Sequence, residues 1–307
     1  MRCIFEGLPM YPAPFRYHRP ASLGEAIQML SALGESAKPL AGGQTLIPIL
    51  KLRMDEPTDL VDITHLPDLR HTVERDGWIE IGALSPHGWV AKSDIAASIP
   101  IVKDCAGGIA DVQVRSRGTI GGSISAADPS GDWPTLLRTL DAEVLCSGPD
   151  GNRAIPVQDF NTAAYTTALA VGELVVGVRF KRPRAGSAGS YIAYKKSAAA
   201  FPVCSVGIQL TLDPGSVCRD VRIVLGGVGP TARRAMQAEA ELRGKTLSDS
   251  LWARAADAAS AIAEPNSDAR GTAEFKHSLL RGLLLKSAHT AMYRCANASI
   301  EGSHVYG

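Results

Sequence analysis

The chain has 307 residues, of which 45% are hydrophobic and 21% charged, and its formal net charge is +1 at pH 7. This length suggests two domains with real cores, and the near-neutral charge gives no reason to expect nucleic acid or an anionic membrane as a partner. No apolar run reaches the roughly 18 residues of a spanning helix. The first twenty residues carry prolines and charges where a signal peptide needs an apolar run. We therefore expect a cytoplasmic protein.

The first part of the chain alternates between helical and strand patterns. Residues 22–35 begin with Ser22 as a helix cap and Glu25 at the capping-box position, followed by apolar residues at helical spacing. Further along, the pattern predicts a helix that prolines divide and four strands. These are a helix over 85–109 and strands over 58–64, 78–84, 142–148 and 173–183.

The pattern changes after residue 180. Residues 181–190 are basic, rich in Gly and Ser and without periodicity, so we place a domain junction there, between domains 1–180 and 181–307. Beyond it, the pattern predicts a three-stranded antiparallel sheet followed by helices, with the glycines of 226–230 ending a strand. The predicted strands lie within 190–196, 201–213 and 217–235, and the helices are 235–244, 248–264 and 273–295. Strands followed by helices indicate an α+β fold.

Two glycine-rich segments have no role in a plain core. The first is "PLAGGQTLIPILKLRM" (residues 39–54) and the second is "RSRGTIGGSISAADPSGDWP" (residues 115–134). Backbone amides in such loops can point at an anion, and nearby hydroxyls can add hydrogen bonds to phosphate oxygens. Two such loops could hold a pyrophosphate between them. Neither loop matches the G-x-G-x-x-G or GxxxxGK[ST] fingerprints.

Together the two segments closely resemble the FAD-binding medium subunit of the molybdenum hydroxylases. This is the family of the carbon monoxide dehydrogenase medium subunit and the xanthine dehydrogenase FAD domain. The resemblance extends to "YIAYKKSAAAFPVCSVGI". It implies a two-subdomain FAD-binding domain of the PCMH type, followed by a C-terminal domain with a three-stranded antiparallel sheet and a helical bundle. It names no catalytic residue and no metal ligand in this chain.

The resemblance also implies which residues contact FAD. Those of the first loop would hold the diphosphate and ribityl, and those of the second loop would face them. Asp132 would accept from an adenosine hydroxyl, Ile109 and Val175 would pack on the cofactor, and Lys195, or Lys196 if the register shifts, would reach toward the flavin. The first loop comprises Pro39, Leu40, Ala41, Gly42, Gly43, Gln44, Thr45 and Leu46, and the second comprises Thr119, Ile120, Gly121, Gly122 and Ser123.

Partners follow from the same resemblance. The six cysteines are scattered singly, and none forms a CxxC or a Cys/His pair at ligand spacing. The resemblance therefore implies 2Fe-2S clusters on a small subunit and the molybdenum cofactor on a large subunit, in a dimer of heterotrimers. The chain would pass electrons from the iron–sulfur subunit to an external acceptor. Gln44 in the first loop offers no attachment point, so we expect non-covalent FAD.

Other interpretations of the same residues remain open. Asp128 and Asp132 could cap and charge the start of a helix without touching a cofactor, and Lys195 and Lys196 could be a solvated pair at a strand end. At the level of function, the alternatives are a stand-alone non-covalent flavin oxidoreductase of the same fold and a flavin-free interaction protein. Intact glycines in both loops argue against the last.

Overall fold

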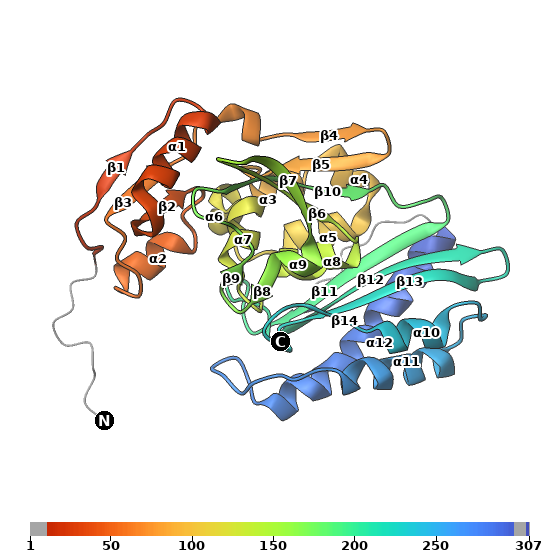
Figure 1. The fold of residues 1–307 in the computed structure, drawn as a ribbon. Helices are drawn as coiled ribbons and strands as arrows, with labels where there is room; N and C mark the ends of the chain where they lie inside the picture. The colour runs from red at the N-terminus through yellow and green to blue at the C-terminus, as the bar shows by residue number, and fades with distance from the viewer. Residues whose placement is uncertain (1–10, 298–304, 307) are drawn as a thin grey trace, which may run out of the picture.

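The structure, a computed structural model, describes residues 11–297 and 305–306. Figure 1 shows three parts that follow one another along the chain: an N-terminal unit in red and dark orange, a central unit that runs from light orange through yellow to green, and a C-terminal sheet with helices from green through cyan to blue. Each part has its own group of buried apolar side chains. The mixed α and β content agrees with the predicted α+β class.

The N-terminal unit is built on a small parallel sheet. Its elements are β1 (Arg16–His18), α1 (Leu23–Leu33), a 3₁₀ turn (Gly34–Ser36), β2 (Ala37–Leu40), α2 (Leu46–Lys51) and β3 (Asp59–Asp62). The strand order is β1-β3-β2, with both outer strands parallel to β3. Ser22 caps α1 by accepting a hydrogen bond from the amide of Glu25, and Ala26 and Leu30 are buried on the inner side of the helix. The local sequence signals for this helix are therefore confirmed.

The central unit combines an antiparallel sheet with several short helices. Its elements are a 3₁₀ turn (Pro67–Leu69), β4 (Thr72–Arg75), β5 (Trp78–Gly82), α3 (His87–Val90), α4 (Asp94–Ser98), α5 (Pro100–Gly108), α6 (Val112–Arg117), α7 (Ile120–Ala126), α8 (Asp132–Thr139), β6 (Glu143–Gly148), β7 (Gly151–Pro156), α9 (Val157–Phe160), β8 (Asn161–Ala163), β9 (Thr166–Thr167) and β10 (Leu174–Lys181). The sheet order is β4-β5-β10-β6-β7. Trp133, Phe160 and Phe180 are fully buried in its core. The fold is not a doubly wound parallel sheet.

The helix predicted over residues 85–109 is three helices. Proline divides it at one place only, where Pro100 begins α5. The other break comes from capping, because the hydroxyl of Ser93 accepts a hydrogen bond from the amide of Ala96 and starts α4.

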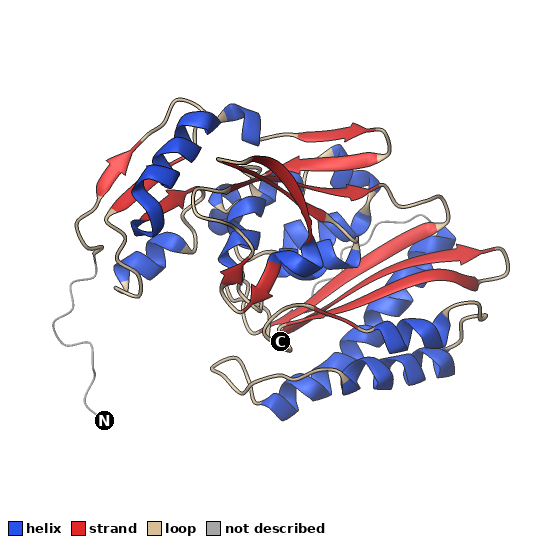
Figure 2. Cartoon of the chain, in the orientation of Figure 1, coloured by secondary structure: helices blue, strands red, loops and turns tan. Residues whose placement is uncertain are grey.

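The C-terminal unit is a sheet with helices on its outer face (Figure 2). Its elements are β11 (Ser187–Lys195), β12 (Cys204–Asp213), β13 (Val217–Gly226), β14 (Arg233–Arg234), α10 (Met236–Leu242), α11 (Asp249–Ala261), α12 (Ala273–Asn297) and β15 (Val305–Tyr306). The order is β14-β13-β12-β11-β15. The three long strands are the predicted antiparallel ones, and two-residue strands extend the sheet at both edges.

The central strands of this sheet serve two cores at once. On β11, Tyr191 and Ala193 belong to the core of the central unit, whereas Ile192 between them belongs to the core with α10–α12. Successive residues of a strand face opposite sides, and here α5 and α8 cover one side while α10 and α12 cover the other. The C-terminal sheet is therefore joined to the central unit by a buried face.

The junction predicted over residues 181–190 is shorter than expected. β10 continues to Lys181 and β11 begins at Ser187, so only residues 182–186 connect the two units. The glycines and serines at the end of this segment are strand residues, and Gly189 lies where a Cβ would be 2.4 Å from the Gln209 side chain. Close strand packing, and not linker flexibility, explains that part of the composition.

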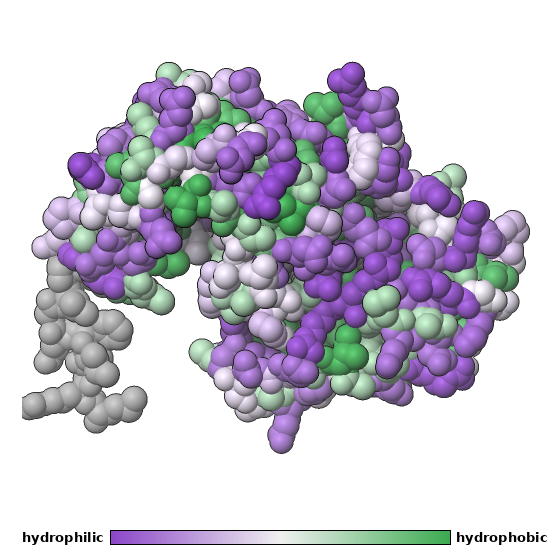
Figure 3. All heavy atoms as spheres, in the orientation of Figure 1, coloured by the Kyte–Doolittle hydropathy of each residue, from purple (hydrophilic) through white to green (hydrophobic). Residues whose placement is uncertain are grey.

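The surface in the orientation of Figure 3 is mainly hydrophilic, and apolar residues appear on it only in small groups. Among the residues that the structure describes, no helix is long and apolar enough to cross a bilayer. The same residues contain no group of three or more His, Cys, Asp or Glu side chains arranged to hold a metal ion.

Candidate cofactor site

The first glycine-rich loop connects β2 to α2 and lies against the segment that precedes the second loop. A Cβ atom on Gly42 would lie 2.1 Å from the carbonyl oxygen of Arg117 and 2.9 Å from the Cα of Gly118. Any side chain at residue 42 would therefore collide with fixed backbone. Gly43 has a φ of +73°, in the left-handed region that favours glycine. The two glycines thus have different tasks: one allows contact between the loops and the other allows the turn.

The second loop is the start of helix α7. Thr119 caps the helix, since its hydroxyl accepts a hydrogen bond from the amide of Gly122 at 3.1 Å. A Cβ on Gly121 would lie 2.6 Å from the Cβ of Ala83, so this glycine allows α7 to pack closely on the chain after β5. The amide of Gly121 bonds to the carbonyl of Ala83, and the amide of Ile120 bonds to that of Ser85.

The two loops therefore differ in what they offer an anion. The amides of residues 120–123 all donate to protein oxygens. Within the described chain, the four successive amides of residues 42–45 donate to none. Unpaired backbone donors gathered in a loop are a ready anion site. The first loop thus has free donors and the second loop packs against it, and a pyrophosphate held between the two loops stays a prediction.

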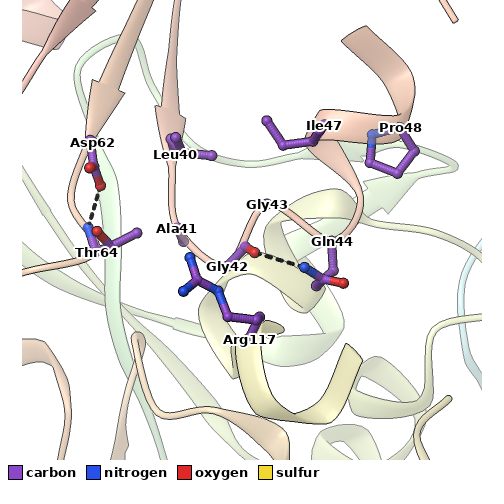
Figure 4. Close-up of a pocket in the computed structure, with 10 residues that line it drawn as sticks. All are labelled: Leu40, Ala41, Gly42, Gly43, Gln44, Ile47, Pro48, Asp62, Thr64 and Arg117. Atoms are coloured by element: carbon purple, nitrogen blue, oxygen red, sulfur yellow. Dashed lines mark hydrogen bonds between the residues drawn. The ribbon is translucent and has the colours of Figure 1, made fainter. Parts of the chain in front are cut away.

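Two adjoining hollows open at this contact. The first, of about 470 Å³, lies over the first loop (Figure 4). The second, of about 530 Å³, runs toward the second loop. They share Ala41, Gly42, Thr64 and Arg117, so they form one continuous groove across the junction of the N-terminal and central units. Leu40, Gly43, Gln44, Ile47, Pro48 and Asp62 complete the first, and His65, Leu66, Pro67, Arg70, Leu84, Pro86, Ser116 and Thr119 complete the second.

Six of the predicted contact residues line these hollows. They are Leu40, Ala41, Gly42, Gly43, Gln44 and Thr119. The side-chain amide of Gln44 donates to the carbonyl of Gly42 at 3.2 Å, which stiffens the loop (Figure 4). Pro39, Thr45, Leu46, Ile120, Gly121, Gly122 and Ser123 flank the hollows without lining them.

The other four predicted residues are buried behind the second loop. Ile109 and Val175 belong to the apolar core of the central unit. Asp132 accepts a hydrogen bond from the hydroxyl of Tyr191 at 2.9 Å and lies 3.6 Å from the ammonium of Lys195. Their flavin contacts remain predictions.

The register of the two lysines is plain in the structure. Lys195 is 1% exposed, and its ammonium donates to the carbonyl of Gly108 at 2.7 Å. Lys196 is exposed and donates to the carbonyl of Ala269 at 3.4 Å. The solvated pair considered as an alternative is therefore wrong for Lys195, which is the inward residue.

A buried histidine, His87, packs against the backbone at Gly118, just before the second loop. His87 accepts a hydrogen bond at Nδ1 from the indole of Trp133 at 3.0 Å, so its proton is on Nε2. Burial, with smaller contributions from the charges of Arg115 and Lys195, lowers the pKa of His87 to about 3. Its Nε2 would be 2.8 Å from a Cβ on Gly118. The imidazole is thus neutral and packed beneath the backbone that contacts Gly42.

Sequence reasoning missed several residues of the groove. Asp62 is the last residue of β3 and Thr64 follows the strand, and nothing in the local pattern separates them from ordinary strand-end residues. Arg117 could have been predicted from the sequence, because it stands two residues before Thr119 in the second glycine-rich segment. A cation so close to a suspected phosphate loop is a usable signal.

A loop with free amides beside a groove, on a fold without a doubly wound parallel sheet, is the arrangement expected of a protein that binds a phosphate-bearing cofactor. The sequence profile of the FAD binding domain in molybdopterin dehydrogenase matches residues 13–183, and that of the CO dehydrogenase flavoprotein C-terminal domain matches residues 189–291. The chain belongs to this family of FAD-binding medium subunits of molybdenum hydroxylases. It is an oxidoreductase subunit.

Individual relatives cover nearly the whole chain. The carbon monoxide dehydrogenase medium chain of Hydrogenophaga pseudoflava is 36% identical over 94% of this chain and 100% of its own length. The glyceraldehyde dehydrogenase medium chain of Sulfolobus acidocaldarius is 35% identical over 91% of this chain and 98% of its own. The solved carbon monoxide dehydrogenase from H. pseudoflava superposes with a TM-score of 0.90 at 37% identity, covering 92% of this chain and 99% of that one.

The residues present fit FAD as the cofactor. The four free amides of residues 42–45 suit a diphosphate, and the adjoining hollows of about 470 and 530 Å³ leave room for a ligand beside them. Asp62 and Thr64 offer oxygen atoms to hydroxyl groups in the first hollow.

Proposed function

We propose that this chain holds FAD non-covalently and passes electrons from an iron–sulfur subunit to an external acceptor. The substrate would be oxidised on a molybdenum subunit of the same complex, and the whole would be a dimer of heterotrimers in the cytoplasm. FAD suits this position because it accepts electrons singly and delivers them in pairs. The observation that carries the proposal is the groove lined by unpaired amides in a chain of this family.

The names of the relatives support the proposal that the flavin subunit and the substrate-oxidising subunit are separate chains. Medium chains of nearly equal similarity come from complexes named for carbon monoxide and for glyceraldehyde. These two substrates share no recognition chemistry. A chain that is so alike in both complexes does not choose the substrate, which is consistent with a role confined to the flavin.

The residues of this chain would then bind, orient and shield the cofactor. The amides of residues 42–45 would donate to the diphosphate, and Thr119 would close the groove on the side of the second loop. Asp62 and Thr64 would meet hydroxyl groups of the ribose or ribityl. Ile109 and Val175 remain the residues predicted to pack on the cofactor, Lys195 the one predicted to reach toward the flavin, and Asp132 the predicted acceptor from an adenosine hydroxyl.

The test is to purify the chain alone, reconstitute it with FAD and assay it with artificial electron acceptors. We expect one FAD per chain, released intact by denaturation, and no oxidation of carbon monoxide, aldehydes, purines or N-heterocycles. Adding the small and large subunits should give turnover. Oxidation by the isolated chain would instead support a stand-alone flavin oxidoreductase, and failure to bind any flavin would support an interaction protein.

A further inference from the structure

Arg117 is the charged side chain common to both hollows of the groove. It is the last residue of α6 and is exposed. Among the residues that the structure describes, its guanidinium has no hydrogen bond and no ion pair. In Figure 4 the guanidinium points toward the backbone at Ala41 and Gly42. A permanently charged group with five donors thus faces the loop whose amides are also unpaired.

The other charged and titratable groups lining the groove are Asp62, His65 and Arg70. The carboxylate of Asp62 accepts from the hydroxyl of Tyr17 and, at 2.8 Å, from the amide of Thr64. The imidazole of His65 lies 2.7 Å from the carbonyl of Pro20. The guanidinium carbon of Arg70 lies 5.6 Å from the centroid of the Trp89 ring, and Arg70 lines the second hollow only. Of the described lining residues, Arg117 is the cation that lines both hollows and lies next to the free amides.

Arg115 is on the same helix as Arg117 and has a structural role. Its guanidinium donates to the carbonyls of Ile109 and Ala110 at 2.9 and 2.6 Å. It closes the turn before α6 and has no part in lining the hollows. On the same short helix, Arg115 therefore has a structural role, whereas the guanidinium of Arg117 has no hydrogen bond or ion pair within the described residues.

We propose that Arg117 binds the diphosphate of FAD, together with the free amides of residues 42–45. The proposal rests on the proposed flavin function and assigns the charge that stabilises the cofactor's two phosphates. Amides supply directed but neutral donors, whereas a guanidinium adds positive charge and can bond two phosphate oxygens at once. The carboxylate of Asp62 at the other side of the first hollow disfavours a phosphate there, so the diphosphate belongs at the Arg117 side.

The backbone holds Arg117 in place for this task. Its carbonyl oxygen is pressed against Gly42, so the Cα of Arg117 and the free amides are fixed relative to each other. The side chain is exposed, and the contact with Gly42 is made by the backbone of Arg117. Arg117→Ala is therefore a clean deletion of the charge.

The experiment uses the full chain, freed of flavin and titrated with FAD by fluorescence quenching at several salt concentrations. The variants are Arg117→Ala, Arg117→Lys and, as a matched control, Lys51→Ala. Lys51 is an exposed cation on α2 beside the same loop, but it does not line either hollow. Circular dichroism and the melting temperature of each apoprotein report folding independently of the flavin.

We expect Arg117→Ala to weaken FAD binding by about ten- to a hundredfold and to flatten the slope of log Kd against log salt. Arg117→Lys should restore the salt slope and part of the affinity, since it keeps the charge but loses the fork. Lys51→Ala should match the wild type.

Two failures are distinguishable. If the wild type binds FAD and Arg117→Ala binds it with the same Kd and salt slope, the role of Arg117 is wrong while the flavin function stands. If the wild type binds no FAD, both are wrong. A loss of affinity with an unchanged salt slope would also contradict the proposal, because it would show a structural effect and not a charge on the diphosphate.

Discussion

Asp104 and Arg294 are 190 residues apart in the sequence and form a buried ion pair with two hydrogen bonds, of 2.6 and 2.9 Å. Asp104 is on α5 of the flavin-binding part, and Arg294 is on the last helix, α12. Arg294 also donates to the carbonyl of Gly189 at 2.7 Å, and the amide of Tyr191 donates to Asp104 at 3.2 Å. The pair therefore fastens three elements across the boundary between the two units.

Removing one partner of this pair should be costly. We expect Arg294→Ala to lower the free energy of unfolding by about 3–5 kcal/mol, because the carboxylate of Asp104 would stay buried without its partner. Arg281 is on the same helix as Arg294 and forms an exposed ion pair with Asp257 of α11. Breaking that pair by Arg281→Ala should cost less than about 1 kcal/mol. Urea denaturation followed by circular dichroism measures both. The double variant Asp104→Ala/Arg294→Ala should lose less than the sum of the single changes; strict additivity would contradict the coupling.

Gly42→Ala should displace the first loop. The added methyl would meet the carbonyl oxygen of Arg117 at 2.1 Å, and backbone on both sides cannot give way cheaply. We expect the Kd for FAD to rise at least about tenfold as the free amides move. Gly282→Ala in α12, where a Cβ meets nothing within 4 Å, should leave FAD binding unchanged and stabilise the helix by about 0.5–1 kcal/mol. Equal FAD affinity in the two variants would show that the loop contact is not needed.

His87 should make stability depend on pH. Its pKa is about 3 in the folded chain and about 6.5 when unfolded, so between these values the unfolded chain binds a proton that the folded chain does not. The free energy of unfolding should therefore fall as pH drops below about 6.5, by at most about 1.4 kcal/mol per unit from this group. His87→Gln keeps an acceptor for Trp133 and removes the titration. Melting temperatures from pH 7.5 to 5 should fall more steeply for the wild type; parallel curves would contradict the assignment.

The four buried thiols among the described cysteines should be unreactive in the native protein. Burial raises the pKa of Cys146 and Cys204 to about 12 and that of Cys218 to about 11, and it raises the pKa of Cys105 well above its ordinary value. Since the thiolate is the nucleophile, a thiol reagent at pH 8 should label these four only after unfolding in guanidinium. The assay is best made in a Cys3→Ser/Cys295→Ser variant, because Cys3 is outside the described residues and Cys295 is only partly buried. Rapid labelling of any of the four in the native state would overturn this expectation.

The sequence by itself determined the local elements. The cap at Ser22, the alternation along β5 and the apolar spacing of α11 and α12 act over a few residues, and the structure has each element where its pattern predicted it. The glycine pairs also marked the site correctly as a place of close approach. They could not tell what is approached: the neighbour of Gly42 is the carbonyl of Arg117, and that of Gly121 is Ala83.

Only the tertiary structure decided how the two loops divide their work. Whether an amide is free depends on which acceptor lies opposite it after packing. In the second loop, the amides of Ile120 and Gly121 donate to the carbonyls of Ser85 and Ala83, which lie more than thirty residues earlier in the chain. The same holds for Asp132 and Lys195, which packing brings together with Tyr191 between two units. Helix caps and hydrophobic periodicity are properties of residues that are neighbours in the sequence. Free donors and buried charges arise where distant segments pack together. Packing removes water from these groups, so their hydrogen bonding then depends on which protein groups lie opposite them.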